Sequence, residues 1–162
     1  MENTVPIVRY SWADVDRLTR CLATSLKAAD LRFDAIVGVL RGGAIPAVHL
    51  SHLMEVRSFG VVHFQTTLTD QSGSERIDPV QLFSPEKKLI SGKRVLLIDD
   101  VVNTGVTLKA AREVLSDLGA ISVYSAVLVW DRLSPEGGQL GTVQCDQWVD
   151  EVTAWVEFPW NN

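Results

Sequence analysis

Short unbroken apolar runs alternate along this chain with segments whose apolar residues recur every three or four positions. The runs have the length of buried strands in a parallel sheet, and the recurring spacing is typical of helices that cover a sheet. We predict strands at 34–40, 56–66, 94–98, 121–130 and 142–149. Helices are predicted from 11 to about 30, from 44 and from 106. The alternation predicts an α/β fold with a mainly parallel sheet flanked by helices.

Local signals support the predicted helices. Ser11 precedes Asp14 by three residues, a capping pair that typically begins a helix. Pro46 fits a first helical turn, where its missing N–H costs nothing. The expected inward faces are Val15, Leu18, Leu22 and Leu26 in the first helix, Ala47, Leu50 and Met54 in the second, and Leu108, Ala111, Leu115 and Leu118 in the third.

The segment 67–92 breaks this pattern. It is polar, contains Pro79 and Pro85, and shows no sustained hydrophobic period. A loop of this length inside a compact domain is usually a functional lid or a mobile segment. We therefore predict a long loop here.

Composition narrows the class of protein. A length of 162 residues predicts one domain, and 46% apolar with 22% charged residues is ordinary for a soluble globule. The net charge of −5 argues against a nucleic-acid partner, and no apolar run is long enough for stable membrane insertion. The N-terminus lacks a signal peptide, and Cys21 and Cys145 have no metal-like spacing, so we expect reduced cysteines and a cytoplasmic location.

The segment 94–108, RVLLIDDVVNTGVTL, carries the clearest candidate chemistry. The predicted strand breaks at Asp99 and Asp100, a short turn covers 101–103, and a TG-x-T sequence leads into the helix. Such strand–turn–helix junctions bind phosphate, because free backbone N–H groups and the helix dipole converge there. Carboxylates accept hydrogen bonds from sugar hydroxyls and hold Mg²⁺. A ligand with a phosphate and a cis-diol, such as ribose 5-phosphate, fits both features.

A second strand–turn–helix junction lies at Leu40-Arg41-Gly42-Gly43. Adjacent glycines expose backbone N–H groups at the strand end where open α/β sheets bind ligands, and Arg41 adds positive charge for a polyanion. Alone, a Gly-Gly turn is more often structural. Beside the phosphate loop, it predicts a second anion site.

Together these motifs resemble the phosphoribosyl-pyrophosphate (PRPP) signature of type I phosphoribosyltransferases. The R-G-G-x-x-P pattern, the Ser-Trp before the first helix and the ending W-V-E-F-P-W are similar to the short bacterial and archaeal xanthine–guanine enzymes. The resemblance spans nearly the whole chain. It implies a single domain over 1–162 with a lid loop at about 67–92 and a small C-terminal hood at about 142–162. It also implies Mg²⁺ as cofactor, PRPP and a nucleobase as partners, and a homodimer or homotetramer.

The resemblance also assigns site residues. Catalytic roles fall on Asn103, Asp99, Asp100 and Arg41, and Asp99 and Asp100 would hold the metal. PRPP would contact Leu40, Arg41, Gly42, Gly43, Asp99, Asp100, Val101, Asn103, Thr104, Gly105, Val106 and Thr107. Trp155 would stack on the purine and Val156 would meet the base edge, with a core or interface tryptophan as the alternative interpretation of Trp155. In the lid, Arg76, Lys87 or Lys88 could reach the pyrophosphate or be solvated surface charges.

Two positions depart from the family pattern. Asn103 stands where the related enzymes carry an aspartate that exchanges a proton with the purine, and asparagine cannot accept that proton. Trp130 aligns with a lysine aimed at the exocyclic oxygen of the base. Asn103→Asp is therefore expected to raise turnover if the acceptor is a 6-oxopurine. The base-side changes leave two alternatives open: transfer to a different acceptor base, or a PRPP-binding regulator without turnover.

Overall fold

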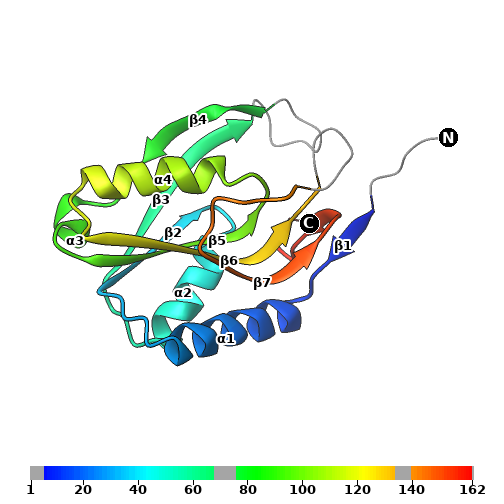
Figure 1. Cartoon of the computed structure of the whole chain (residues 1–162), viewed down its shortest axis with the longest axis horizontal. Coiled ribbons are helices and arrows are strands. Elements are labelled where there is room, and N and C mark those ends of the chain that lie inside the picture. The colour runs from blue at the N-terminus through cyan, green and yellow to red at the C-terminus, as the bar shows by residue number, and fades with distance from the viewer. Residues whose placement is uncertain (1–5, 68–75, 134–139, 162) are drawn as a thin grey trace.

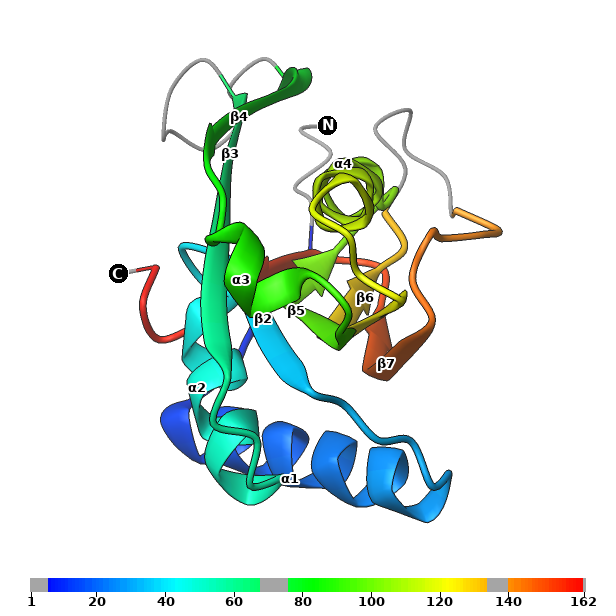
Figure 2. The same ribbon diagram turned by 90° about the vertical axis from the view of Figure 1, so that its left-hand side faces the viewer.

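The computed structural model describes residues 6–67, 76–133 and 140–161. Its elements run in the order β1 (Ile7–Arg9), α1 (Trp12–Ala28), β2 (Ala35–Leu40), α2 (Ala44–Leu53), β3 (Phe59–Thr67), β4 (Arg76–Phe83), α3 (Lys87–Ile90), β5 (Arg94–Val102), α4 (Val106–Asp117), β6 (Ser122–Asp131), β7 (Gln147–Val152) and β8 (Trp155–Glu157). Figures 1 and 2 show a sheet with α1 and α2 on one face and α4 on the other.

The main sheet has six strands in the order β4-β3-β2-β5-β6-β7. Every neighbouring pair is parallel except β3 and β4. The predicted α/β class with a mainly parallel sheet is therefore confirmed. A second sheet pairs β1 with β8 in parallel, and the sequence pattern did not predict β1.

Burial on the two faces explains why the central strands read as continuous apolar runs. Along β5, Val95 and Leu97 join the core beneath α4, whereas Leu96 and Ile98 join the core beneath α1 and α2. The predicted inward residues of α1 are all buried. The Ser11 hydroxyl accepts a hydrogen bond from the Asp14 amide at 3.2 Å, and the Asp14 carboxylate accepts one from the Ser11 amide at 2.9 Å. These two bonds confirm the predicted capping pair.

Three predicted boundaries are wrong. The segment 67–92 is not one long loop, because β4 pairs antiparallel with β3 and α3 follows it. Residues 68–75 of the predicted lid lie outside the described residues. β5 does not break at the carboxylates, because its parallel pairing with β6 continues to Val102. The strand expected at 142–149 lies at 147–152 instead, where it extends the main sheet beside β6.

Among the residues that the structure describes, no helix is both long and apolar enough to cross a membrane.

Candidate active site

A cavity of about 490 Å³ opens at the carboxyl ends of the parallel strands. This is the edge where open α/β sheets bind ligands. Nine of the sequence-predicted site residues line the cavity: Asp99, Val101, Asn103, Thr104, Gly105, Val106, Thr107, Trp155 and Val156. The remaining predicted residues, Leu40, Arg41, Gly42, Gly43, Asp100 and Trp130, are not part of its lining. The phosphate-loop and base-stacking candidates therefore share one cavity.

The glycines after β2 pack directly behind the carboxylate pair. A Cβ atom on Gly43 would lie 2.7 Å from the Cα and Oδ1 atoms of Asp99, and a Cβ on Gly42 would overlap the Asp100 carboxylate. Real Cβ atoms do not approach other atoms so closely, so both positions require glycine. The Arg41–Gly43 segment thus touches the two acids, for a packing reason that the sequence pattern did not reveal.

Asp99 and Asp100 point to different environments. Asp99 lines the cavity, whereas the Oδ2 atom of Asp100 accepts a hydrogen bond from the indole N–H of Trp160 at 3.2 Å. The backbone amide of Asp100 donates to the Asp99 Oδ1 atom, and that of Val101 donates to the Asp100 Oδ1 atom, both at 2.9 Å. Two adjacent acids are therefore held by the backbone at the end of β5.

The carboxylate pair is electrostatically costly. Burial raises the pKa of Asp99 well above its ordinary value, and the neighbouring Asp100 charge raises it further. Burial also raises the pKa of Asp100, although hydrogen bonds from Asp99, from the Val101 amide and from the Trp160 indole oppose this shift. Within the described part of the chain, neither acid forms an ion pair with lysine or arginine. A divalent cation or a hydroxyl-rich ligand would relieve this repulsion.

The phosphate loop ends at Gly105, which adopts a left-handed conformation with φ of 89°. α4 begins at the next residue, so its first amide groups, which lack acceptors within the helix, lie at the cavity. Gly105 is constrained a second time, because a Cβ there would lie 2.9–3.0 Å from the Cβ, N and O atoms of Gln144. The loop is therefore backed by a segment that comes from between β6 and β7.

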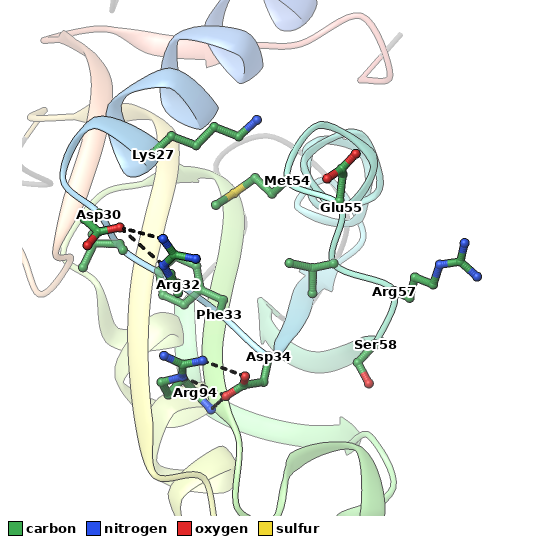
Figure 3. A pocket seen from close by; sticks show the side chains of 12 residues that line it. Lys27, Asp30, Arg32, Phe33, Asp34, Met54, Glu55, Arg57, Ser58 and Arg94 are labelled. Carbon is green, nitrogen blue, oxygen red and sulfur yellow. Dashed lines mark hydrogen bonds and ion pairs between the residues drawn. The ribbon is translucent and has the colours of Figure 1, made fainter.

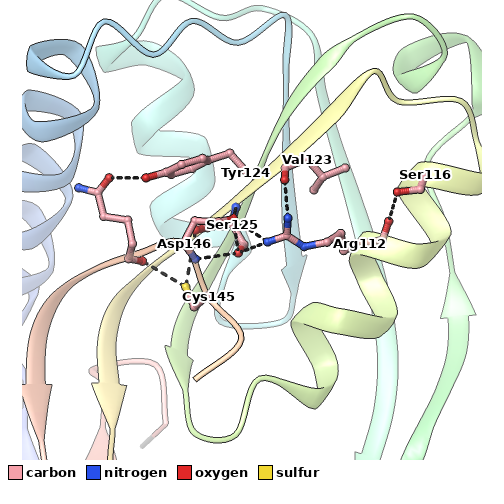
Figure 4. A network of polar contacts seen from close by, with 8 residues as sticks. Arg112, Ser116, Val123, Tyr124, Ser125, Cys145 and Asp146 are labelled. Carbon is pink, nitrogen blue, oxygen red and sulfur yellow. Dashed lines mark hydrogen bonds and ion pairs between the residues drawn. The ribbon is translucent and has the colours of Figure 1, made fainter. Parts of the chain in front are cut away.

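An ion-pair network holds that backing segment in place (Figure 4). Arg112 of α4 donates to the Asp146 carboxylate at 2.6 Å, to the Ser125 hydroxyl at 2.8 Å and to the Val123 carbonyl at 2.7 Å. Burial alone would raise the pKa of Asp146, but hydrogen bonds from the Ser125 amide and from Arg112 hold it below its ordinary value. Sequence reasoning missed this support, since the partners of Arg112 lie 11 to 34 positions from it in the chain.

Asn103 uses its amide to join two parts of the site. Its Nδ2 atom donates to the backbone carbonyls of Asp131 and Leu133, both at 2.8 Å. The indole N–H of Trp130 in turn donates to the Asn103 carbonyl at 3.2 Å. An aspartate could not donate either amide bond and would set a carboxylate against two carbonyl oxygens. Asn103 therefore connects the phosphate loop to the end of β6.

At the end of β6, the residue that lines the cavity is not the one predicted to face the base. Trp130 is only 5% exposed and packs edge-to-face on Trp148, with ring centroids 4.8 Å apart. The next residue, Asp131, lines the cavity instead, and its Oδ1 atom accepts from the Leu133 amide at 2.8 Å. Trp155, 40% exposed, lines the cavity as predicted. An acidic group thus stands at the end of β6, where the resemblance placed a cation.

The lid prediction has a partial counterpart. Ile77, Asp78 and Pro79 of β4 line the cavity, together with Thr66 and Thr67 of β3. Lys87 and Lys88 belong to α3 and do not line it. Sequence reasoning missed the β4 contribution because it treated the whole segment as loop.

A larger cavity, of about 690 Å³, lies at the opposite edge of the sheet (Figure 3). There Arg94 donates to both oxygens of Asp34 at 2.8 and 2.9 Å, and Arg32 bonds Asp30 at 3.3–3.4 Å. The Arg94 bonds hold the pKa of Asp34 far below its ordinary value. Because these acids already have their cations, and the strands begin here rather than end, this cavity is not the candidate active site.

The fold and the carboxyl-edge cavity are typical of α/β proteins that bind phosphorylated ligands. The model of the phosphoribosyl transferase domain family matches residues 12–161, and the chain belongs to this family. The predicted resemblance is confirmed.

Individual relatives are similar over most of their length. A xanthine-guanine phosphoribosyltransferase from Chromohalobacter salexigens is 32% identical over 154 residues, which is 93% of this chain and 82% of the relative. Another from Gluconobacter oxydans is 30% identical, covering 98% of this chain and 87% of the relative. The crystal structure of a purine phosphoribosyltransferase from Pyrococcus horikoshii Ot3 has a TM-score of 0.75 at 32% identity, covering 96% of this chain and 95% of that one.

Proposed function

We propose that this protein transfers the 5-phosphoribosyl group from PRPP to a purine base of the guanine, xanthine or hypoxanthine type, releasing pyrophosphate and forming a nucleoside monophosphate. The observation that carries the proposal is the shared cavity, which is lined both by Asp99 and the loop 103–107 and by Trp155 and Val156. The membership of the family and the names of the relatives support the same reaction.

The residues divide the substrate between them. The amide groups at the start of α4 and the hydroxyls of Thr104 and Thr107 bind the 5′-phosphate. Asp99 and Asp100 accept hydrogen bonds from the ribose hydroxyls, and Arg41 with the Gly42–Gly43 backbone binds the pyrophosphate. Trp155 stacks on the base, and the Val156 backbone meets its edge. Departure of pyrophosphate leaves positive charge on the ribose, which the two carboxylates stabilise.

The acids at the end of β5 also fit Mg²⁺. Two half-buried, mutually repelling carboxylates are hard oxygen ligands that a divalent cation would satisfy. The described residues hold no group of three or more histidine, cysteine or acidic side chains placed for a metal, so PRPP and water would complete the coordination. When bound, Mg²⁺ would offset the charge of the departing pyrophosphate.

In this proposal Asn103 has a different role from the one expected by resemblance. Because both N–H groups of its amide are directed at backbone carbonyls, Asn103 positions the loop rather than exchanging a proton with the base. General-base catalysis contributes about 10²–10⁴-fold where it operates. Turnover without it would be slow, and the leaving group would provide most of the driving force.

The assay measures pyrophosphate release from PRPP and Mg²⁺ with guanine, xanthine, hypoxanthine, adenine, uracil or orotate. We expect turnover with at least one of the three 6-oxopurines. Release only with another base would favour a second candidate, transfer to a different acceptor, and the acidic Asp131 in the cavity is the observation behind it. Saturable PRPP binding with no release for any base would instead indicate a regulator.

The cytoplasmic location and the homodimer or homotetramer stay predictions.

A further inference from the structure

Two remote segments lie against one carboxylate oxygen of Asp100. The indole N–H of Trp160 donates to the Oδ2 atom at 3.2 Å from a position 60 residues further along the chain. Gly42 lies against the same carboxylate, and a Cβ on Gly42 would also come within 2.9 Å of the Trp160 indole nitrogen. The bond therefore lies at the junction of β5, the loop after β2 and the segment after β8.

An aromatic stack fixes the direction of the Trp160 indole. Its ring lies parallel to Phe158, with centroids 4.7 Å apart and an interplanar angle of 8°. Phe158 is 2% exposed and stacks in turn on Tyr10 at 5.3 Å. Trp12 also packs on Trp160, with ring centroids 5.7 Å apart and ring planes tilted by 56°. These ring contacts favour the orientation in which the indole N–H faces Asp100.

The stack is itself tied to the rest of the fold. β1 and β8 pair in parallel, and the Tyr10 amide extends this pairing by donating to the Glu157 carbonyl at 2.9 Å. The Tyr10 hydroxyl donates to Asp150 of β7 at 2.7 Å, and the Phe158 amide donates to the Asn161 side chain at 2.7 Å. The small second sheet therefore fixes the position of the aromatic stack that contains Trp160.

With Trp160 present, both oxygens of Asp100 have fixed partners, since its Oδ1 atom accepts from the Val101 amide at 2.9 Å. A carboxylate held at both oxygens presents its remaining lone pairs in set directions. Without the indole N–H, the Asp100 carboxylate would lose the hydrogen bond that Trp160 donates to its Oδ2 atom and would be freer to rotate. Preorganisation of this kind reduces the free-energy cost of ordering a site when a ligand binds.

We propose that Trp160 is a positioning residue of the PRPP site, which orients the Asp100 carboxylate through its indole N–H. The inference rests on the proposed function, because only that function assigns Asp100 to PRPP and Mg²⁺. It makes the β1–β8 sheet and its aromatic stack a functional part of the site, although none of the stacked rings lines the cavity.

The test compares Trp160→Phe with Trp12→Phe. The first variant keeps an aromatic ring in the stack and removes the N–H. The second changes the neighbouring tryptophan, which is 59% exposed and has no side-chain hydrogen bond to Asp100. We expect Trp160→Phe to weaken PRPP binding in the presence of Mg²⁺ about tenfold, the usual contribution of a hydrogen bond to a charged group. Trp12→Phe should bind PRPP as the wild type does.

Two measurements separate positioning from stability. Calorimetry gives the PRPP affinity, and steady-state kinetics should show a raised KM for PRPP with an unchanged KM for the base. The thermal midpoint of each variant shows how much packing was lost. Weaker PRPP binding in Trp160→Phe than in Trp12→Phe, at similar midpoints, supports the inference. Equal PRPP affinity in Trp160→Phe and the wild type overturns it, whatever the midpoints.

A measurement on the wild type keeps the inference testable if Trp160→Phe does not fold. The indole N–H resonance of Trp160 in ¹⁵N-labelled protein should shift when PRPP and Mg²⁺ are added, whereas that of Trp148, packed on Trp130, should not. A Trp160 resonance that stays in place at saturating PRPP would overturn the inference alone. A wild-type chain that binds no PRPP would overturn the proposed function as well.

Discussion

The carboxylates at the two ends of the parallel strands are stabilised in opposite ways. At the edge where the strands begin, Asp34 receives two bonds from Arg94 and a third from the Arg94 amide at 2.9 Å, and its pKa falls. At the edge where the strands end, burial raises the pKa of both Asp99 and Asp100. The charge of Asp34 is therefore neutralised by Arg94 within the protein. The charges of Asp99 and Asp100 are left for a ligand to neutralise.

This contrast separates structural charge from functional charge. Groups whose ionisation is disfavoured by the fold gather at functional sites, because the protein accepts the instability in order to bind or react. Ion pairs such as Asp34–Arg94 link segments that are distant in sequence and need nothing further. Removing an acid where the strands end should therefore raise stability and weaken ligand binding, whereas removing Asp34 should lower stability and leave binding unchanged.

The largest effect is expected from Asp99→Asn. Removal of this charge should weaken PRPP binding by about 10³-fold, as when one partner of a desolvated charged contact is lost. The same variant should raise the thermal midpoint by about 3 °C, because it removes a half-buried charge that repels Asp100. Calorimetry and a thermal melt measure the two quantities. Asp34→Asn is the matched control, and should lower the midpoint while leaving PRPP affinity unchanged. Retained PRPP affinity in Asp99→Asn would contradict the site assignment.

Gly105→Ala tests the phosphate loop at the same edge. Both the left-handed backbone and the approach of Gln144 oppose a Cβ at this position. A displacement of the loop by about 1 Å would lower kcat/KM for PRPP about 10²-fold. Gly92→Ala is the control, since Gly92 also has a positive φ, of 71°, but a Cβ there meets nothing within 4 Å. Comparable kinetic losses in both variants would show that backbone strain, and not the Gln144 contact, is responsible.

Asn103→Asp tests the two hydrogen bonds that connect the phosphate loop to the end of β6. The sequence alone predicts higher turnover from a restored general base. The structure predicts the reverse, because two amide bonds to the 131 and 133 carbonyls are lost. We expect kcat with the best base to fall about tenfold. Higher turnover at any pH between 6 and 9 would restore the general-base interpretation.

Asp146→Asn tests the outer support of the loop. Its carboxylate accepts from Arg112 and from the Ser125 amide, at 2.6 and 2.7 Å. Loosening the segment behind Gly105 should raise the KM for PRPP about fivefold, roughly the contribution of one hydrogen bond. Asp34→Asn again serves as the comparison, since it also breaks a bonded ion pair with arginine. An equal KM in both variants would make the Arg112 network a stability feature only.

The smallest effect concerns the dependence of stability on pH at the opposite edge. Asp34 has a lowered pKa in the folded chain, so its stabilising contribution is present above the unfolded value of about 3.9 and is lost as pH falls below it. Wild type should therefore melt above Asp34→Asn at pH 7, and the difference should shrink below pH of about 4. A difference that is constant from pH 7 to pH 3 would rule out this contribution.

The sequence predicts the parts of the fold that local patterns determine. The Ser11 cap, the buried β2 strand and the helix after Gly105 follow from residues within a few positions of each other. β4 escaped prediction because it is an edge strand in which the four residues from Val80 to Phe83 are all exposed, so alternation of buried and exposed residues is confined to its first half. Its pairing with β3 also contains register shifts, which blur any period.

In the site, too, local sequence patterns predict some contacts and leave others unpredicted. The loop 103–107 is readable because its residue types and spacing carry the chemistry. The end of β6 is not, because successive side chains of a strand point to opposite faces, and residue types alone do not say which of two neighbours faces the cavity. In the structure Asp131 lines the cavity, whereas Trp130 packs on Trp148. The contacts of Trp160 and Gln144 with the site depend on segments that are adjacent only after folding, and no local pattern reveals them.

The Asn103 amide has a thermodynamic consequence. It bonds the segment that would hold the phosphate to the segment beside the base, so ordering either segment favours the ordered form of the other. Such coupling is reciprocal in free energy: whatever factor PRPP adds to the affinity for the base, the base adds to the affinity for PRPP. The two substrates of this protein should therefore bind cooperatively, and a nucleotide analogue that fills both segments should bind more tightly than its separate halves predict.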